Sequence, residues 1–135
     1  MTLYLLDTNA VVSLLRNSVS NIAQRLRRER PADVAISSIV AHELFYGAYR
    51  SARPAHNLAL VEALRFEVME FDTEDARQAG RVRALLAERG SPIGPYDFLI
   101  AGQAAARGLT LVTHNRAEFQ RAPGLKCEDW EIAPA

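Results

Sequence analysis

Short apolar runs alternate with longer helix-like patterns along the chain, and this alternation limits the possible folds more than any other feature of the sequence. Runs typical of strands cover residues 3–6, 34–37, 66–71, 109–112 and, as a last short extended piece, 125–127. Helical patterns cover residues 10–15, 19–30, 38–50, 54–64, 72–89 and 96–107. This order favours strands joined by helical crossovers. We therefore predict an α/β fold with a central, mostly parallel sheet of four to five strands and helices on both faces.

Turn and capping residues mark the ends of several of these helices. Pro31 ends the second helix, and Gly90 and Gly108 stand where helices commonly end. Asp72, followed three residues later by Asp75, resembles a capping box. The stretch 90–95 is predicted to be a loop, and the apolar helix 96–107 is predicted to lie inside the fold.

The size and composition of the chain indicate one globular domain over residues 1–135. A single cysteine, Cys127, excludes an intramolecular disulfide framework and a multi-cysteine zinc site, and it suits a reducing compartment. The N-terminal segment lacks the positive region of a signal peptide, and no apolar run approaches the ~20 residues that span a bilayer. We therefore expect a cytoplasmic protein without a membrane partner. The formal net charge of zero means that a nucleic-acid partner has to be argued from local sites.

Polar residues follow two of the predicted strands directly. Asp7 comes after the strand 3–6, while Asn115 and Glu118 follow the strand 109–112. The carboxyl ends of parallel strands meet at one edge of a sheet, where ligands bind. We therefore expect these side chains to approach one another.

Two further acids stand on apolar faces of predicted helices. Asp97 shares a helical face with Ile100, Ala101 and Ala104, and Glu43 lies one turn inside the helix that follows the second strand. Carboxylates gathered in a partly buried place repel one another unless a cation lies between them. Mg²⁺, which prefers oxygen ligands, satisfies that need. The residues predict a metal-binding cluster that consists of Asp7, Glu43, Asp97 and Glu118.

Each acid also has a purely structural interpretation. Asp7 can cap the following helix, with Thr8 and Asn9 sharing that role. Asp97 can be a first-turn acid favoured by the helix dipole. Glu43 can pair with an arginine, and Glu118 can be a surface acid. The case for a site therefore depends on the set of acids.

Other chemistries are disfavoured by what the sequence lacks. His42-Glu43 begins like a zinc-protease helix, but Tyr46 stands where the second histidine is needed. No glycine-rich phosphate loop follows a strand. Asp7-Thr8-Asn9 lacks the second aspartate of a phospho-aspartate phosphatase.

Five segments together resemble the VapC-type toxins of the PIN-domain ribonuclease family, over essentially the whole chain and in order. They are Leu5-Leu6-Asp7-Thr8-Asn9; Ser37-Ser38-Ile39-Val40 with Glu43-Leu44 and Tyr46-Gly47; Gly94-Pro95-Tyr96-Asp97 with Ile100-Ala101; Val112-Thr113 with Asn115 and Glu118-Phe119; and Gly124-Leu125 with Glu128-Asp129-Trp130.

The resemblance implies a PIN-like fold and roles for particular residues. Asp7, Glu43 and Asp97 match the metal-binding acids of the family, and Thr8 and Asn9 match supporting positions beside the first acid. Asn115 and Glu118 match a fourth, more variable corner, where many PIN domains carry an aspartate in place of Asn115. Whether Glu118 completes the site, and whether one or two ions bind, stays open at this point.

The resemblance also implies an activity and partners. Such a protein is an endoribonuclease that hydrolyses RNA phosphodiester bonds with Mg²⁺, for which Mn²⁺ can substitute, and relatives suggest tRNA as a target. It acts as the toxin of a type II toxin–antitoxin pair, is held inactive by a VapB antitoxin, and contacts operator DNA only through that antitoxin. Family members are commonly homodimers. The apolar residues offered for either contact are Leu14, Leu15, Ile22, Leu26, Phe45, Tyr46 and Tyr49.

Two alternatives remain beside the toxin. The chain can be a PIN-domain nuclease of RNA processing that has no antitoxin, or a catalytically degenerate module that binds RNA or protein. The nearly complete set of acids disfavours the degenerate module, and the short chain disfavours a processing enzyme.

Overall fold

The structure, a computed structural model, describes residues 1–90 and 93–132. Its sheet consists of β1 (Tyr4–Leu6), β2 (Val34–Ser37), β3 (Glu67–Met69), β4 (Thr110–Val112) and β5 (Lys126–Glu128). The strand order is β3-β2-β1-β4-β5, and each neighbouring pair is parallel. The predicted α/β fold is confirmed, with five strands in the sheet.

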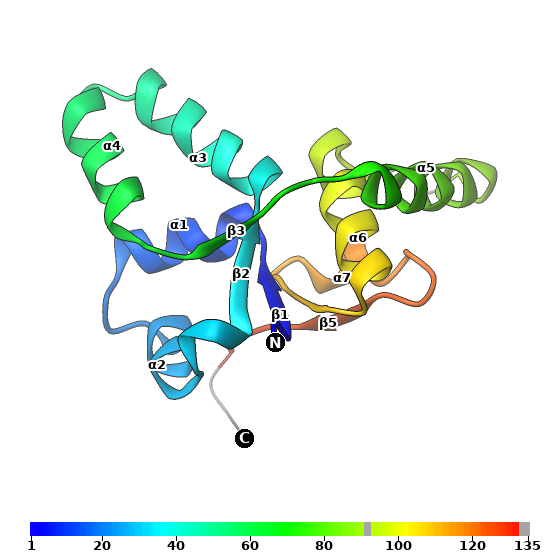
Figure 1. Cartoon of the computed structure of the whole chain (residues 1–135), viewed down its shortest axis with the longest axis horizontal. Coiled ribbons are helices and arrows are strands. Elements are labelled where there is room, and N and C mark those ends of the chain that lie inside the picture. Colours follow the sequence, from blue (N-terminus) through cyan, green and yellow to red (C-terminus); the bar gives the residue numbers. More distant parts are fainter. Residues whose placement is uncertain (91–92, 133–135) are drawn as a thin grey trace.

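Seven α-helices connect and cover these strands. They are α1 (Thr8–Arg16), α2 (Asn21–Arg28), α3 (Ser38–Arg50), α4 (Pro54–Ala63), α5 (Thr73–Glu88), α6 (Pro95–Arg107) and α7 (Arg116–Phe119), with a 3-10 turn at Pro31–Asp33 among the described residues. In Figure 1, α1 and α2 lie to the left of the strands, and α5 and α6 lie to the right. Helices therefore cover both faces, as predicted.

The element boundaries differ from the sequence prediction by one or two residues at several ends. The second helix begins at Asn21 rather than at residue 19, because Ser20 caps it by accepting the Ala23 N–H. The last strand lies at Lys126–Glu128, one residue later than predicted. Residues 91–92 of the predicted loop lie outside the described part of the chain.

The order of the strands places a topological switch point at β1. The chain passes from β1 to β2 on one side, and β4 later joins β1 on the other side. At such a point the connections leave in opposite directions and open a crevice at the carboxyl ends of the strands. Asp7 follows β1 there, and its backbone N–H donates to the carbonyl of Val112 on β4 at 3.0 Å.

The core lies on both faces of the central strands. Leu5 and Leu6 of β1 and Leu111 of β4 are completely shielded from solvent. Continuous apolar strands of this kind suit a parallel sheet covered by helices. β3 is an edge strand with two exposed residues out of three.

Helices α5 and α6 pack closely through a glycine. A Cβ atom built on Gly102 would lie 2.4 Å from both the Cα and the N atom of Ala79, so no larger residue fits without moving the helices. Ala101 and Ala104 on α6 are fully buried, which confirms the predicted interior helix. The predicted capping box is also present, because Asp72 and Asp75 exchange side-chain-to-backbone hydrogen bonds of 3.0 and 2.9 Å.

Among the described residues, no helix combines the length and the apolar character that a bilayer crossing requires.

Candidate active site

Asp7 lies at the end of β1 with only 5% of its surface exposed. Its Oδ1 atom accepts the Ala10 N–H at 2.8 Å, so Asp7 caps α1 as the structural interpretation required. Burial raises the pKa of the Asp7 carboxyl, with smaller additions from the charges of Glu131 and Glu43, while Thr113 and the Ala10 N–H act in the opposite direction. Capping uses one face of this carboxylate, and the carboxylate also borders a pocket.

Glu43 projects from α3 toward the same place. Burial raises the pKa of its carboxyl, and the nearby Thr8 hydroxyl offsets part of that effect. The Thr8 Oγ1 atom is itself buried and does not meet the geometry of a hydrogen bond to any partner. A buried hydroxyl without a partner costs free energy, on the order of 1–3 kcal/mol. The Glu43–Thr8 pair therefore leaves hydrogen-bonding capacity unused at the pocket.

Asp97 stands in the first turn of α6, which Gly94 caps and Pro95 opens. The pKa of its carboxyl is raised to about 6, first by burial and then by the negative charges of Glu118, Asp7 and Glu43. The absence of a side chain at Gly94 leaves room for this carboxylate, because a Cβ atom there would lie 3.0 Å from Asp97 Oδ2.

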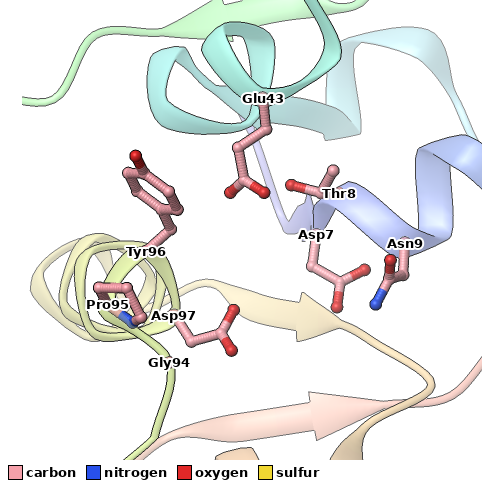
Figure 2. A pocket seen from close by; sticks show the side chains of 8 residues that line it. All are labelled: Asp7, Thr8, Asn9, Glu43, Gly94, Pro95, Tyr96 and Asp97. Atoms are coloured by element: carbon pink, nitrogen blue, oxygen red, sulfur yellow. The ribbon is translucent and has the colours of Figure 1, made fainter. Parts of the chain in front are cut away.

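These side chains line one pocket of about 230 Å³ at the carboxyl edge of the sheet. In Figure 2, the carboxylates of Asp7, Glu43 and Asp97 border this common space from the junction of β1 and α1, from α3 and from α6. The lining residues are Asp7, Thr8, Asn9, Glu43, Gly94, Pro95, Tyr96 and Asp97. The structure thus brings together the three predicted metal-binding acids and two of the predicted supporting residues, Thr8 and Asn9, but not Asn115.

Glu118 and Asn115 are not among the residues that line this pocket, although the Glu118 carboxyl lies within hydrogen-bonding reach of the Asp97 carboxyl. Glu118 Oε1 accepts the Gly94 N–H at 3.1 Å, and Glu118 Oε2 accepts a hydrogen bond from the Asn115 amide. Glu118 therefore holds the loop that carries Asp97, and its charge is the strongest charge effect on the pKa of Asp97. The Asn115 amide is engaged with Glu118.

One nearby acid was not predicted. Glu131, beyond β5, raises the pKa of Asp7 through its charge. Its Oε2 atom lies 3.3 Å from His114 Nδ1, which also contacts Asp129 Oδ2 at 2.9 Å. The potential ligand atoms of His114, Asp129 and Glu131 lie within 4.8 Å of one another. Glu131 stands outside every regular element, so no periodic pattern marked it.

The pocket fits a hard divalent cation by its donor set. Carboxylates with raised pKa values surround it, and the buried Thr8 Oγ1 has no hydrogen-bond partner. A cation between the acids removes their mutual repulsion, and oxygen-only ligands suit Mg²⁺ or Mn²⁺. Asp7, Glu43 and Asp97 are the residues that would hold it.

Comparisons with known proteins agree with this arrangement. The PIN domain family model matches residues 4–125. The chain is 45% identical over 132 residues to the tRNA(fMet)-specific endonuclease VapC of Salmonella typhimurium, covering 96% of this chain and 99% of the relative. It is 40% identical, with the same coverage, to the tRNA(fMet)-specific endonuclease VapC of Shigella flexneri.

Solved structures give the same result for the fold. The structure of DNA-bound VapBC from Salmonella typhimurium matches with a TM-score of 0.92 and 45% identity, covering 96% of this chain and 99% of that chain. The structure of VapBC2 from Rickettsia felis, bound to a DNA fragment from the promoter, matches with a TM-score of 0.90 and 34% identity, with the same coverage. The chain therefore belongs to the PIN-domain family and, within that family, to the VapC group.

Proposed function

We propose that this protein is a divalent-metal-dependent endoribonuclease and the toxin of a VapBC toxin–antitoxin pair. The observation that carries the proposal is the convergence of Asp7, Glu43 and Asp97 on one pocket from three separate elements. The names of the VapC relatives support RNA as the substrate class. The intact set of acids disfavours a degenerate binding module.

Mg²⁺, with Mn²⁺ as a substitute, is the cation that we propose for this site. When bound, the ion lowers the pKa of a water nucleophile and neutralises charge on the phosphoryl oxygens. Asp7, Glu43 and Asp97 supply the negative charge that attracts it. Asp97, whose pKa is about 6, has to lose its proton before it contributes fully to that attraction.

The other residues of the pocket orient these acids and the RNA. Glu118 fixes the Gly94 loop that carries Asp97, and we assign it a positioning role rather than a direct ligand role. The Thr8 hydroxyl lowers the pKa of the Glu43 carboxyl, so we propose that it orients that carboxylate. Tyr96 is 45% exposed at the rim, where its ring can stack on a base.

The proposed antitoxin site is a groove of about 410 Å³ between α1, α3 and α4 that reaches the acids through Thr8 and Glu43. Leu15, Leu44 and Leu60 line it, which suits an apolar antitoxin segment. A basic antitoxin residue that entered the acidic pocket would take the place of the cation. The titles of the VapBC relatives support such a partner, and their bound DNA supports operator contact through the antitoxin.

Not all the apolar residues that the sequence suggests for protein contacts are exposed to solvent. Ile22 is 1% exposed and belongs to the core, so its apolar side chain serves packing on α2. Tyr46 and Tyr49 on α3 are 61% and 67% exposed. We propose these two rings for contact with the antitoxin or with a second copy of the chain.

Residues 1–135 are proposed to act as one domain, because the described core forms one cluster around one sheet. We propose tRNA as the substrate class, as the names of the Salmonella and Shigella relatives suggest.

The test is cleavage of purified tRNA by purified, antitoxin-free protein with Mg²⁺, with Mn²⁺ and with EDTA. We expect cleavage with either ion, none in EDTA, and a loss of at least ~100-fold in Asp97→Asn. Glu62→Gln, on the exposed face of α4, is the matched control and should cleave like the wild type. Cleavage in EDTA, or RNA binding without cleavage under every condition, would contradict the proposal. If the chain were instead a nuclease of RNA processing, no neighbouring gene would encode a protein that blocks cleavage.

A further inference from the structure

A second hollow, of about 280 Å³, lies between α2 and the segment that follows β5. Its lining includes the side chains of Arg25, Arg28 and Arg116, together with the indole of Trp130. We call it the arginine pocket. Three guanidinium groups face one hollow here although the formal net charge of the whole chain is zero.

The three arginines differ in how their charge is compensated. Arg25 is held in place by Glu29 at 2.8 Å and Glu128 at 3.4 Å, and its guanidinium lies 4.7 Å from the ring centroid of Trp130. Arg28 and Arg116 are exposed, and neither side chain forms a hydrogen bond or ion pair within the described part of the chain. Two positive charges at the pocket therefore have no internal partner.

Among the described residues, the acid at this pocket, Asp129, forms no ion pair with Arg28 or Arg116. The Asp129 side chain is 5% exposed and contacts His114 Nδ1 at 2.9 Å. Its other oxygen accepts the Glu131 N–H at 2.9 Å. The carboxylate is thus already engaged, and the surface that the pocket offers to a ligand is cationic at Arg28 and Arg116.

Contacts connect the arginine pocket to the candidate active site. Arg116 directly follows Asn115, whose amide donates to Glu118, and Glu118 in turn accepts the N–H of Gly94 in the wall of the active site. Burial raises the pKa of the Cys127 thiol. The positive charge of Arg116 lowers this pKa and the negative charge of Asp7 raises it, so both charges lie near the same thiol. The segment 115–118 therefore contributes Arg116 to the arginine pocket and also supports the wall of the candidate active site through Glu118.

We propose that the arginine pocket binds a backbone phosphate of the RNA strand whose scissile bond lies in the candidate active site. The inference rests on the proposed function and names a subsite for that substrate. Guanidinium groups match phosphate oxygens in pairs, and Arg28 and Arg116 can do so without breaking an existing ion pair. Arg25, fixed by its two glutamates and by Trp130, sets the shape of the wall.

The test compares two double variants that each remove two positive charges. Arg28→Gln/Arg116→Gln removes the unpaired charges of the pocket, and Arg50→Gln/Arg81→Gln removes two exposed charges on α3 and α5. For tRNA cleavage in Mg²⁺ we expect the first variant to raise KM roughly tenfold with kcat within about twofold. Its plot of log affinity against log salt should be less steep by about 0.7, the value for one lost single-strand phosphate contact. The control variant should match the wild type in both measurements.

A set of RNA oligonucleotides shortened step by step from either end locates the contact. Shortening from one end should weaken cleavage by the wild type at a defined length. Cleavage by Arg28→Gln/Arg116→Gln should not change at that step. Equal responses of the two double variants, or a pocket variant that cleaves normally but no longer binds an antitoxin, would overturn the inference. Anisotropy of labelled RNA in EDTA compares RNA binding by the two double variants without catalysis. A failed cleavage assay would therefore contradict the proposed function without deciding this inference.

Discussion

The backbone N–H of Gly94 donates a hydrogen bond of 3.1 Å to Glu118 and so joins the loop before α6 to α7. The same glutamate exerts the strongest charge effect on the pKa of Asp97. One side chain therefore controls both the position of the loop and the protonation of the acid that the loop carries. These two roles can be separated by substitution.

Glu118→Gln keeps an oxygen that can accept the Gly94 N–H but removes the negative charge. Burial is the largest cause of the raised pKa of Asp97 and the charge of Glu118 is the next, so we expect the value to fall below about 6 in this variant. Titration of the carboxyl carbon signal of Asp97 by NMR measures the change. An unchanged pKa in Glu118→Gln would mean that burial alone accounts for the shift, and Glu62→Gln provides the reference.

Asp97→Asn should stabilise the metal-free protein while it abolishes cleavage. The folded state raises the pKa of Asp97 to about 6 and so binds its proton more tightly than the unfolded chain does. The stability linked to Asp97 is therefore complete below the unfolded value near 3.8 and is lost as the pH rises through about 6.

Between pH 4 and pH 7.5 the wild type should lose roughly 1–2 kcal/mol relative to Asp97→Asn, after allowance for partial exposure of the carboxyl. Urea unfolding in EDTA at each pH measures this difference. If the unfolding free energies of the two proteins changed with pH in parallel, the raised pKa of Asp97 in the folded protein would be contradicted. Added Mg²⁺ should stabilise the wild type at pH 7.5 much more than the variant.

Gly94→Ala tests how closely Asp97 must fit. The added methyl group would stand 3.0 Å from Asp97 Oδ2 and would push the carboxylate away from its position. We expect RNA cleavage to fall about tenfold while the unfolding free energy changes by less than about 1 kcal/mol. Gly80→Ala, which meets no atom within 4 Å, is the control and should retain activity. Full activity of Gly94→Ala would show that the carboxylate tolerates the displacement.

Gly102→Ala should destabilise the fold through the contact between α5 and α6. The new Cβ atom would lie 2.4 Å from the backbone of Ala79, so the helices have to separate, at a cost of about 2–3 kcal/mol. Gly80→Ala on α5 should instead stabilise by roughly 0.5–1 kcal/mol, because it lowers the entropy of the unfolded chain. Thermal unfolding of both variants in one buffer compares them. Similar melting temperatures would contradict the close packing at Gly102.

The parts of the structure that depend on local periodicity could be predicted from the sequence. β2 and α3 lie at the predicted residues 34–37 and 38–50, because an apolar run passes there directly into a helical pattern. Asp7 was placed at the sheet edge by strand geometry alone. It caps α1, as its structural interpretation predicted, and it also lines the pocket, while its role as a metal ligand stays a prediction.

What could not be predicted depends on contacts between distant segments. The Gly94–Glu118 hydrogen bond and the effect of Glu131 on Asp7 arise only when the chain is folded. Ile22 is suggested by the sequence for a protein contact, but in the folded chain it belongs to the buried core cluster. That Glu118 contacts Asp97 without lining the pocket likewise follows from tertiary structure, because its spacing from β4 fits either position.

The hydrogen bond from the Asp7 backbone to Val112 has a consequence for the newly made chain. Asp7 emerges from the ribosome early, yet the strand that orients it is among the last segments to be synthesised. A growing polypeptide thus exposes acidic residues that are not yet arranged for chemistry. Assembly of the pocket has to wait until translation has passed β4, so an unfinished chain carries the acids without the site.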